Sequence, residues 1–305
     1  MVSEVVLAAV CDPDPQITRQ RVSEWGGFLR QLQPVASPER LLERDDIEGI
    51  IVDGGVHENL ALARMALEAD KHVLLEKPAG VDLKDFWSLH ELARARRLRL
   101  QMGYVMRYNA GFELVRRLHA GGALGDVFSV RSRLSWEGAS YASQMPKIEA
   151  LAGGMLFELG CHYLDLITIL LGRPKRCHGF LASHHDPARR HTDNTIGLLE
   201  YPAAFAVIES AAMESGALQN RAFEVYGTRG TAVVQPFEPP EIVVHLREPW
   251  GDIQSGWQTV PLQPVPRHVR DLQEFAACIR GDKEPEFAPE HDLLVQETLL
   301  RLCEG

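Results

Sequence analysis

The sequence has no excess of basic residues and no long apolar run. Its 305 residues carry 32 Lys and Arg against 42 Asp and Glu, a formal net charge of -10. This balance argues against a nucleic-acid-binding protein, because a phosphate backbone requires a basic surface. The longest apolar run, residues 164–171, contains Asp165 and Thr168 and is too short to cross a bilayer. We therefore predict neither a nucleic-acid partner nor membrane association.

Paired cysteines are also missing. The five cysteines are scattered, and no two of them form a C-x-x-C pair. Neither a zinc site nor a disulfide framework is indicated, since both need cysteines at characteristic spacings. Scattered cysteines fit a reducing compartment, so we predict a cytoplasmic protein without a bound metal.

The chain is long enough for two domains, and its pattern changes near Gly103. Before that residue, short aliphatic runs alternate with amphipathic segments, which is typical of a parallel sheet covered by helices. After it, β-rich runs joined by turn residues predict a mainly antiparallel sheet. The predicted fold is therefore α/β plus α+β, with a Rossmann-like domain over residues 1–103 and an open, mainly antiparallel sheet in a second domain over residues 104–305.

Helices are expected at several places along the chain. Apolar residues recur at helical spacing over residues 59–69, and Asp82 stands where an N-cap would open the next helix. In the second domain we predict helices over residues 111–120, 269–280 and 291–303, and the last two close the chain.

In the stretch "HVLLEKPAG", residues 72–80, charged residues follow directly after a predicted buried strand. Its apolar run predicts a strand buried on both faces, followed at once by Glu76, Lys77 and Pro78. An ion pair followed by a turn proline would explain these residues structurally. Ligands of open α/β sheets, however, bind beyond the carboxyl ends of the strands. We therefore predict that Lys77 acts on a substrate oxygen, steadied by Glu76 and aimed by Pro78.

The stretch "GGMLFELGCHYLDLITILLG", residues 153–172, predicts a helix of about four turns. Glu158, His162 and Asp165 fall at i, i+4 and i+7 and share one helical face. A core histidine beside a helix-start acid would explain the pattern, and a metal site would also use these residue types. We favour proton transfer, because histidine titrates near neutrality and a neighbouring carboxylate orients its ring.

Three blocks, in this order, resemble the Gfo/Idh/MocA family, the group of glucose-fructose oxidoreductase and inositol dehydrogenase. They are "HVLLEKPAG", "GYVMRYN" at residues 103–109, and "GGMLFELGCHYLD". The resemblance implies a Rossmann domain that binds NAD or NADP and a second domain that binds substrate. It also implies hydride transfer at a hydroxyl-bearing carbon of a sugar, cyclitol or related polyol, and a homo-oligomer formed through the sheet of the second domain.

The resemblance assigns roles by position. It implies that His162 is the acid/base, that Lys77 contacts substrate and nicotinamide, and that Glu158 stands where most members have aspartate. On the same basis we expect cofactor contacts from Asp12, Asn59, Glu76 and Lys77, and substrate contacts from Arg107, Tyr108, Asn109 and Asp165.

A G-x-G-x-x-G turn after a first strand, which would hold the pyrophosphate, is missing from the sequence. The opening "EVVLAAVCD" looks like the second strand of a Rossmann domain. It ends in Asp12, which would hold the adenosine ribose and favour NAD over NADP. We favour the interpretation that residues not included in this sequence supply the first strand. The alternative is that another part of the protein takes the place of this strand in the sheet. Two alternatives stay open. One is a cofactor-deficient sugar-binding or interface protein, and the other is an enzyme that uses bound NAD transiently to cleave a glycoside or to eliminate water.

Overall fold

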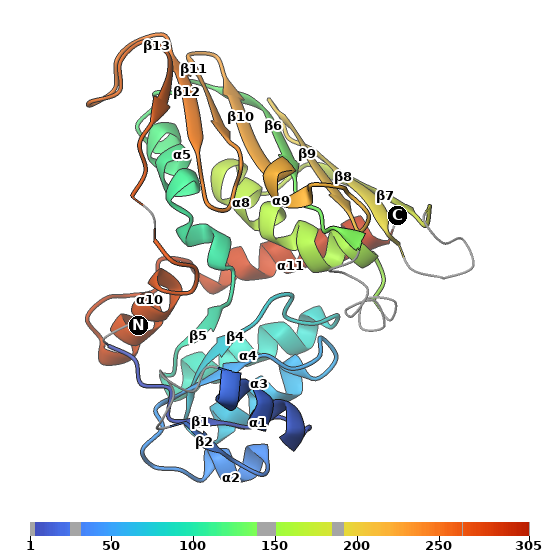
Figure 1. Cartoon of the computed structure of the whole chain (residues 1–305), viewed down its shortest axis with the longest axis vertical. Helices are drawn as coiled ribbons and strands as arrows, with labels where there is room; N and C mark the ends of the chain where they lie inside the picture. Colours follow the sequence, from blue (N-terminus) through green and yellow to red (C-terminus); the bar gives the residue numbers. More distant parts are fainter. Residues whose placement is uncertain (1–3, 25–31, 139–150, 185–191, 264, 305) are drawn as a thin grey trace. The chain divides into compact units, whose positions relative to one another are not determined.

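The computed structural model describes residues 4–24, 32–138, 151–184, 192–263 and 265–304 (Figure 1). The chain divides into two compact units. The first unit comprises Met1–Gly103 and His268–Glu286, and the second comprises Tyr104–Arg267 and Phe287–Gly305. The chain first passes from one unit to the other after Gly103. The segment 268–286, which we had predicted to belong to the second domain, groups with the first unit, because its helix packs against the N-terminal parallel strands: Phe275 lies 3.0 Å from the position of a Cβ on Gly49.

The first unit contains two parallel sheets. β1 (Ala9–Val10) pairs with β2 (Gln33–Pro34), and a three-stranded sheet has the order β3 (Gly49–Val52), β4 (His72–Leu75), β5 (Leu100–Met102). Helices connect and flank these strands: α1 (Pro15–Glu24), α2 (Pro38–Leu42), α3 (Asn59–Glu68), α4 (Leu83–Arg96) and α10 (Arg270–Arg280).

The strand order explains why the parallel sheet is in two pieces. A doubly wound sheet of order 3-2-1-4-5-6 places its second and fourth strands on the two sides of its first strand. Here β2-β1 matches the 3-2 part and β3-β4-β5 matches the 4-5-6 part. Within the described residues no strand lies between β1 and β3, and Ile51 of β3 is 44% exposed. The Rossmann-like topology predicted from the sequence is thus present on both sides of its centre.

Local sequence accounts for the better-formed elements of this unit. Val73, Leu74 and Leu75 of β4 are buried, as an apolar run in a parallel strand requires. The side chain of Asp82 accepts hydrogen bonds from the backbone N–H groups of Lys84 and Asp85 at 2.8 and 2.9 Å. The predicted N-cap of α4 is therefore confirmed.

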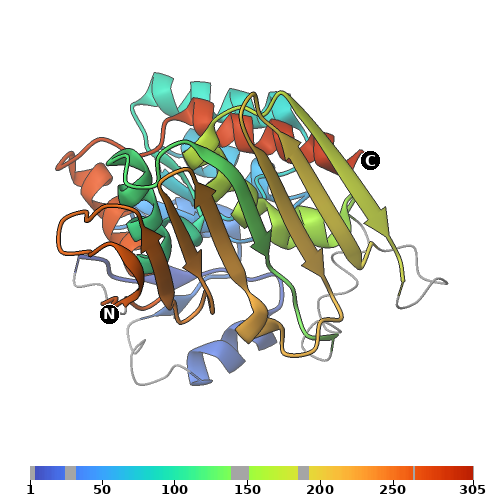
Figure 2. The same cartoon turned by 90° about the horizontal axis from the view of Figure 1, so that it is seen from above.

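The second unit is built on one eight-stranded sheet of order β13-β12-β11-β10-β6-β9-β8-β7 (Figure 2). All neighbouring strands are antiparallel except β6 and β9, which run parallel. The strands are β6 (Val127–Arg133), β7 (Arg176–Ala182), β8 (Asn194–Glu200), β9 (Phe205–Ala211), β10 (Ala222–Gly227), β11 (Gly230–Val234), β12 (Ile242–Leu246) and β13 (Gly256–Val260). The open, mainly antiparallel sheet is confirmed, although β7 and β13 had not been predicted as strands.

Helices cover one face of this sheet, and no described helix of this unit covers the other face, called the open face below (Figure 2). The covering helices are α5 (Ala110–Ala120), η2 (Leu156–Gly160), α8 (Cys161–Leu171) and α11 (Pro289–Cys303). The unit also contains η1 (Val105–Tyr108) and α9 (Ala217–Asn220). The open face carries aromatic side chains that are more than half exposed, namely Phe180, Phe205 and Trp257. No helix among the described residues is long and apolar enough to cross a membrane.

The segment 153–172 differs from its prediction. It is a π-helical turn, η2, followed by the α-helix α8, whereas we had predicted one regular helix of about four turns. Leu159, Leu166, Ile167 and Leu170 are buried. The π turn changes the angle at which Glu158 projects, because an i→i+5 turn is wider than an α-helical one.

Candidate active site

The carboxyl ends of β3, β4 and β5 form one edge in the first unit. The N–H of Glu76 donates to the carbonyl of Val52 at 2.9 Å, and the N–H of Gly103 donates to that of Leu75 at 2.7 Å. A Cβ atom on Gly103 would lie 2.9 Å from Cδ of Glu76. Gly103 therefore leaves the room that the Glu76 carboxylate occupies at this edge.

Glu76 and Lys77 stand at this edge directly after β4. Burial raises the pKa of Glu76, and the nearby charge of Lys77 offsets only part of that effect. The carboxylate of Glu76 also accepts a hydrogen bond from the N–H of Lys77 at 3.2 Å, and the Lys77–Pro78 peptide bond is cis. Lys77, half-buried, thus lies at the strand end where an α/β sheet binds its ligands.

The two other predicted cofactor residues also lie near strand ends. Asp12 follows β1, and its Oδ1 accepts a hydrogen bond from the N–H of Asp14 at 2.7 Å. Asn59 is buried at the start of α3, where its Oδ1 accepts a hydrogen bond from the N–H of Gly54 at 2.9 Å. Asn59 therefore ties the turn after β3 to the helix that follows.

His162 lies in the first turn of α8 and is 3% exposed. Its ring meets the ring of Tyr104 edge to face, with centroids 6.2 Å apart and an interplanar angle of 80°. Glu158, in the preceding π turn, is partly exposed. Short π segments inside helices occur frequently at functional sites, so the turn that displaces Glu158 from the predicted α-helical face also marks this segment as a candidate site.

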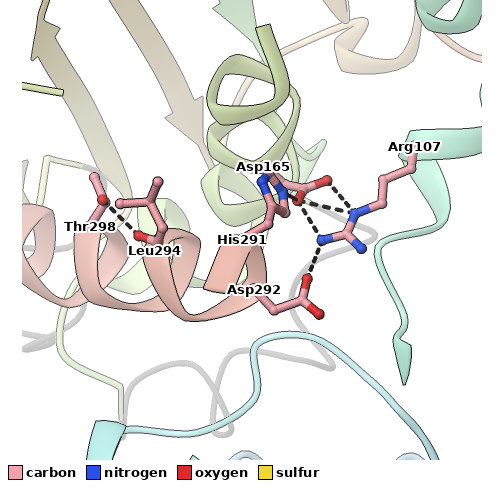
Figure 3. A network of polar contacts seen from close by, with 6 residues as sticks. All are labelled: Arg107, Asp165, His291, Asp292, Leu294 and Thr298. Carbon is pink, nitrogen blue, oxygen red and sulfur yellow. Dashed lines mark hydrogen bonds and ion pairs between the residues drawn. The ribbon is translucent and has the colours of Figure 1, made fainter. Parts of the chain in front are cut away.

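Asp165, one turn after His162, is at the centre of a buried polar network (Figure 3). Its carboxylate accepts hydrogen bonds from Nε of Arg107 at 2.9 Å and Nη2 of Arg107 at 2.7 Å. It also contacts Nε2 of His291 at 2.8 Å. Nη2 of Arg107 donates to Asp292 as well, at 2.5 Å. Figure 3 shows that the four side chains come from η1, α8 and α11.

The charges in this network compensate one another. Burial by itself raises the pKa of Asp165, but the Arg107 guanidinium and the contact with His291 outweigh it, so the pKa lies below its ordinary value. For Arg107, burial lowers the pKa, and the carboxylates of Asp165 and Asp292 raise it to a net value above the ordinary one. The side chains of Arg107 and Asp165 are 2% and 0% exposed, so both stay ionised out of contact with solvent.

Asp165, His291 and Asp292 each offer an atom that could bind a metal, and these atoms lie within 4.8 Å of one another. The guanidinium of Arg107 is hydrogen-bonded to both carboxylates, at 2.7 and 2.5 Å. A fixed organic cation therefore supplies the positive charge that a metal ion would otherwise bring to these acids.

The remaining predicted substrate residues are in η1 and at its end. Tyr108 is half-buried. The Oδ1 of Asn109 accepts hydrogen bonds from the N–H groups of Gly111 and Phe112 at 2.9 and 3.2 Å, and its Nδ2 donates to the carbonyl of Phe237 at 2.8 Å. In this structure the amide of Asn109 caps α5.

Sequence analysis did not identify Tyr104, His291 or Asp292 as members of this cluster. His291 and Asp292 are 126 and 185 residues away in sequence from their partners Asp165 and Arg107. The local signal is the polar "PEHD" at the start of α11, where acids are ordinary N-terminal residues. No periodicity within one segment connects residues so far apart.

The first unit thus has a split parallel sheet with a charged strand end, where α/β sheets bind ligands, and the second unit presents a histidine on a buried helix. Two family models match the chain: the oxidoreductase family with an NAD-binding Rossmann fold over residues 2–104, and the GFO/IDH/MocA C-terminal domain over residues 112–233. The chain belongs to the Gfo/Idh/MocA family of oxidoreductases.

Relatives and solved structures agree with this assignment. An uncharacterized oxidoreductase of Escherichia coli K12, YdgJ, is 27% identical over 73% of this chain and 65% of its own length. A dTDP-3,4-didehydro-2,6-dideoxy-alpha-D-glucose 3-reductase of Streptomyces violaceoruber is 33% identical over 58% of this chain, which spans 52% of that enzyme. The structure of a levoglucosan dehydrogenase with NADH and levoglucosan superposes with a TM-score of 0.80 over 98% of this chain and 88% of that one. At 17% identity, this last likeness concerns the fold.

Proposed function

We propose that the protein is an NAD-dependent oxidoreductase that transfers hydride at a hydroxyl-bearing carbon of a sugar, cyclitol or related polyol. The observation that carries this proposal is that a chain of this family has both Lys77 at a strand end of its first unit and His162 on a charge-anchored helix of its second unit. The similarity to a dTDP-3,4-didehydro-2,6-dideoxy-alpha-D-glucose 3-reductase supports the substrate class.

In the proposed reaction, His162 removes the proton from the substrate hydroxyl as general base. Lys77 and Glu158 orient the substrate oxygens by hydrogen bonding, and Tyr108 is the remaining residue of η1 that we assign to the substrate. A bound nicotinamide cofactor would supply the hydride acceptor. Because the proton and the hydride leave the same carbinol group, both must be removed for the carbonyl to form.

The residues of the first unit fit part of the cofactor. Asp12 after β1 suits the hydroxyls of the adenosine ribose and favours NAD over NADP, and Lys77 suits the nicotinamide end. The amides of Gly54 and Gly55 are engaged by Asn59 Oδ1 at 2.9 Å and by Glu58 Oε2 at 3.3 Å. Within the described residues these two glycines therefore do not offer the bare amides that a pyrophosphate needs.

The first experiment is a titration of the chain with NADH and, separately, NADPH, followed by nicotinamide fluorescence. Oxidation of a panel of sugars and cyclitols is then measured as NADH formation. Tighter binding of NADH, and turnover that falls by about 10²–10⁴-fold in His162→Ala, are expected. Full turnover in His162→Ala would refute the assigned base. Product formed without net NADH would instead identify an enzyme that uses the cofactor transiently.

We propose also that a second copy of the chain covers the open face of the second unit's sheet. Three aromatic side chains, Phe180, Phe205 and Trp257, are 61%, 58% and 65% exposed there. Exposed apolar surface of this kind marks interaction sites. Light scattering coupled to size exclusion is expected to show a homo-oligomer, and Phe205→Glu is expected to shift it toward monomer. A monomeric wild-type chain would contradict this proposal.

A further inference from the structure

The helix that carries His162, α8, also carries the buried, charged side chain of Asp165. His162 and Asp165 are three residues apart on α8 and so project from neighbouring turns of one face. Asp165 is 0% exposed and bonded to Arg107 and His291. A rotation or translation of α8 would break these bonds and leave a buried charge without its partner, which is strongly unfavourable.

Arg107 also reaches His162 by a second path, through an aromatic ring. The guanidinium Cζ lies 4.8 Å from the ring centroid of Tyr104, and the same ring packs edge to face against the imidazole of His162. The guanidinium Cζ also lies 4.2 Å from the ring centroid of Phe287. Cation–π contacts of this kind are attractive and fix the relative orientation of the two groups.

Tyr104 acts here as a ring and not as an acid. Its side chain is fully buried, and burial raises its pKa far above the ordinary value, so the phenol stays neutral. Within the part of the chain that the structure describes, its hydroxyl makes no hydrogen bond. The contribution of Tyr104 to its neighbours is therefore the shape and the π-face of the ring.

We infer that Arg107 and Tyr104 are positioning residues for His162, which hold its imidazole in a single orientation. Arg107 fixes α8 through Asp165 and fixes the Tyr104 ring by direct contact, and that ring limits the rotation of the imidazole. Arg107 and Asp165, which the sequence had led us to place against the substrate, thus act through His162. Placement matters at this level because misplacing a catalytic group by about 1 Å can cost about 100-fold in rate.

This inference rests on the proposed function for its kinetic consequences, but its structural part can be tested without turnover. Histidine labelled with ¹³C at Cε1 is incorporated into the full chain, and the His162 signal is assigned by its loss in His162→Gln. One sharp signal is expected for the wild type. In Arg107→Lys, which keeps the charge and loses the planar fork, and in Tyr104→Leu, the signal is expected to shift and to broaden or split.

A matched control variant is available at another arginine that forms an ion pair with α11. Arg173, just beyond the end of α8, pairs with Glu297 of α11 at 2.8 Å, but its side chain is 58% exposed. Arg173→Lys is expected to leave the His162 signal as in the wild type. Circular dichroism and the urea midpoint show whether each variant is folded. An unchanged His162 signal in both folded Arg107→Lys and folded Tyr104→Leu would overturn the inference.

Where the wild type turns over an alcohol, kinetics add a second test. We expect kcat to fall about 10-fold in Arg107→Lys and about 10–100-fold in Tyr104→Leu, with the KM for NAD changed less than about twofold. Tyr104→Phe, which keeps the ring, is expected to recover most of kcat. A rise in the KM for NAD without a fall in kcat would contradict the positioning role. If the wild type oxidises nothing, the proposed function fails while the labelled-histidine measurement still decides this inference.

Discussion

Two carboxylates, one in each unit, are buried to different extents, and their pKa values are shifted in opposite directions. Glu76 at the end of β4 is partly buried, and burial raises its pKa. Asp165 on α8 is completely buried, yet its pKa is lowered because burial is outweighed by Arg107 and His291. The difference teaches that partners rather than depth decide whether a buried acid is ionised.

The same chemical change in the two carboxylates should have opposite effects on stability. Asp165→Asn leaves Arg107 with only part of its compensating charge, and we expect the free energy of unfolding to fall by about 3 kcal/mol. Urea unfolding followed by circular dichroism measures the loss. A loss below about 1 kcal/mol would mean that the network contributes no more than a surface pair.

Glu76→Gln should change the stability in the opposite direction, and the size of this change should depend on pH. A raised pKa in the folded state means that the protonated acid is favoured by folding, so its contribution is complete below the ordinary pKa of about 4.3 and is lost as the pH rises through the folded value. The stability of Glu76→Gln relative to the wild type is therefore expected to increase between about pH 4 and pH 7. Urea midpoints over this range measure the trend.

Asp165 supplies the control for that pH series. Its lowered pKa stabilises the folded chain above the ordinary pKa of aspartate, about 3.9, and this stabilisation is lost as the pH falls through the lowered value. The difference between the wild type and Asp165→Asn should therefore shrink only in acid. Parallel trends in the two variants would contradict the opposite environments that the structure gives these acids.

A smaller effect is expected at the N-cap of α4 in the first unit. Asp82 accepts two backbone hydrogen bonds there, and Asp82→Ala should lower the free energy of unfolding by about 1 kcal/mol. Urea unfolding of Asp82→Asn, which keeps a capping oxygen, is the comparison, and it should retain most of the stability. Equal losses in the two variants would show that the charge matters and the cap does not.

The smallest effect belongs to the exposed ion pair of Arg173 with Glu297. Although its 2.8 Å distance is close to those of the buried network, we expect Arg173→Ala to change the free energy of unfolding by only about 0–1 kcal/mol, because solvent screens exposed charges. A thermal or urea melt beside Asp165→Asn makes the comparison direct. A loss as large as that of Asp165→Asn would remove burial as the explanation.

The sequence by itself determined several elements and the motifs of this protein. The apolar run of β4 ends in Glu76 and Lys77 because a strand must leave the core there, and the cap at Asp82 is a local feature of the same kind. The position of His162 on a mostly apolar helix could also be read from one segment. These are consequences of spacing within a few residues, which the chain carries wherever it folds.

The tertiary structure alone decided what surrounds those residues. The π turn η2, which contains Glu158, packs against β8, β9 and α11, all distant from it in the sequence. The pairing of β6 with β9 in a mixed sheet joins strands more than seventy residues apart in the sequence. The Arg107–Asp165–Asp292 contacts join three segments whose approach no local pattern encodes. Burial then turns those contacts from weak surface pairs into a fixed anchor for His162, because a charge removed from water must keep its partner.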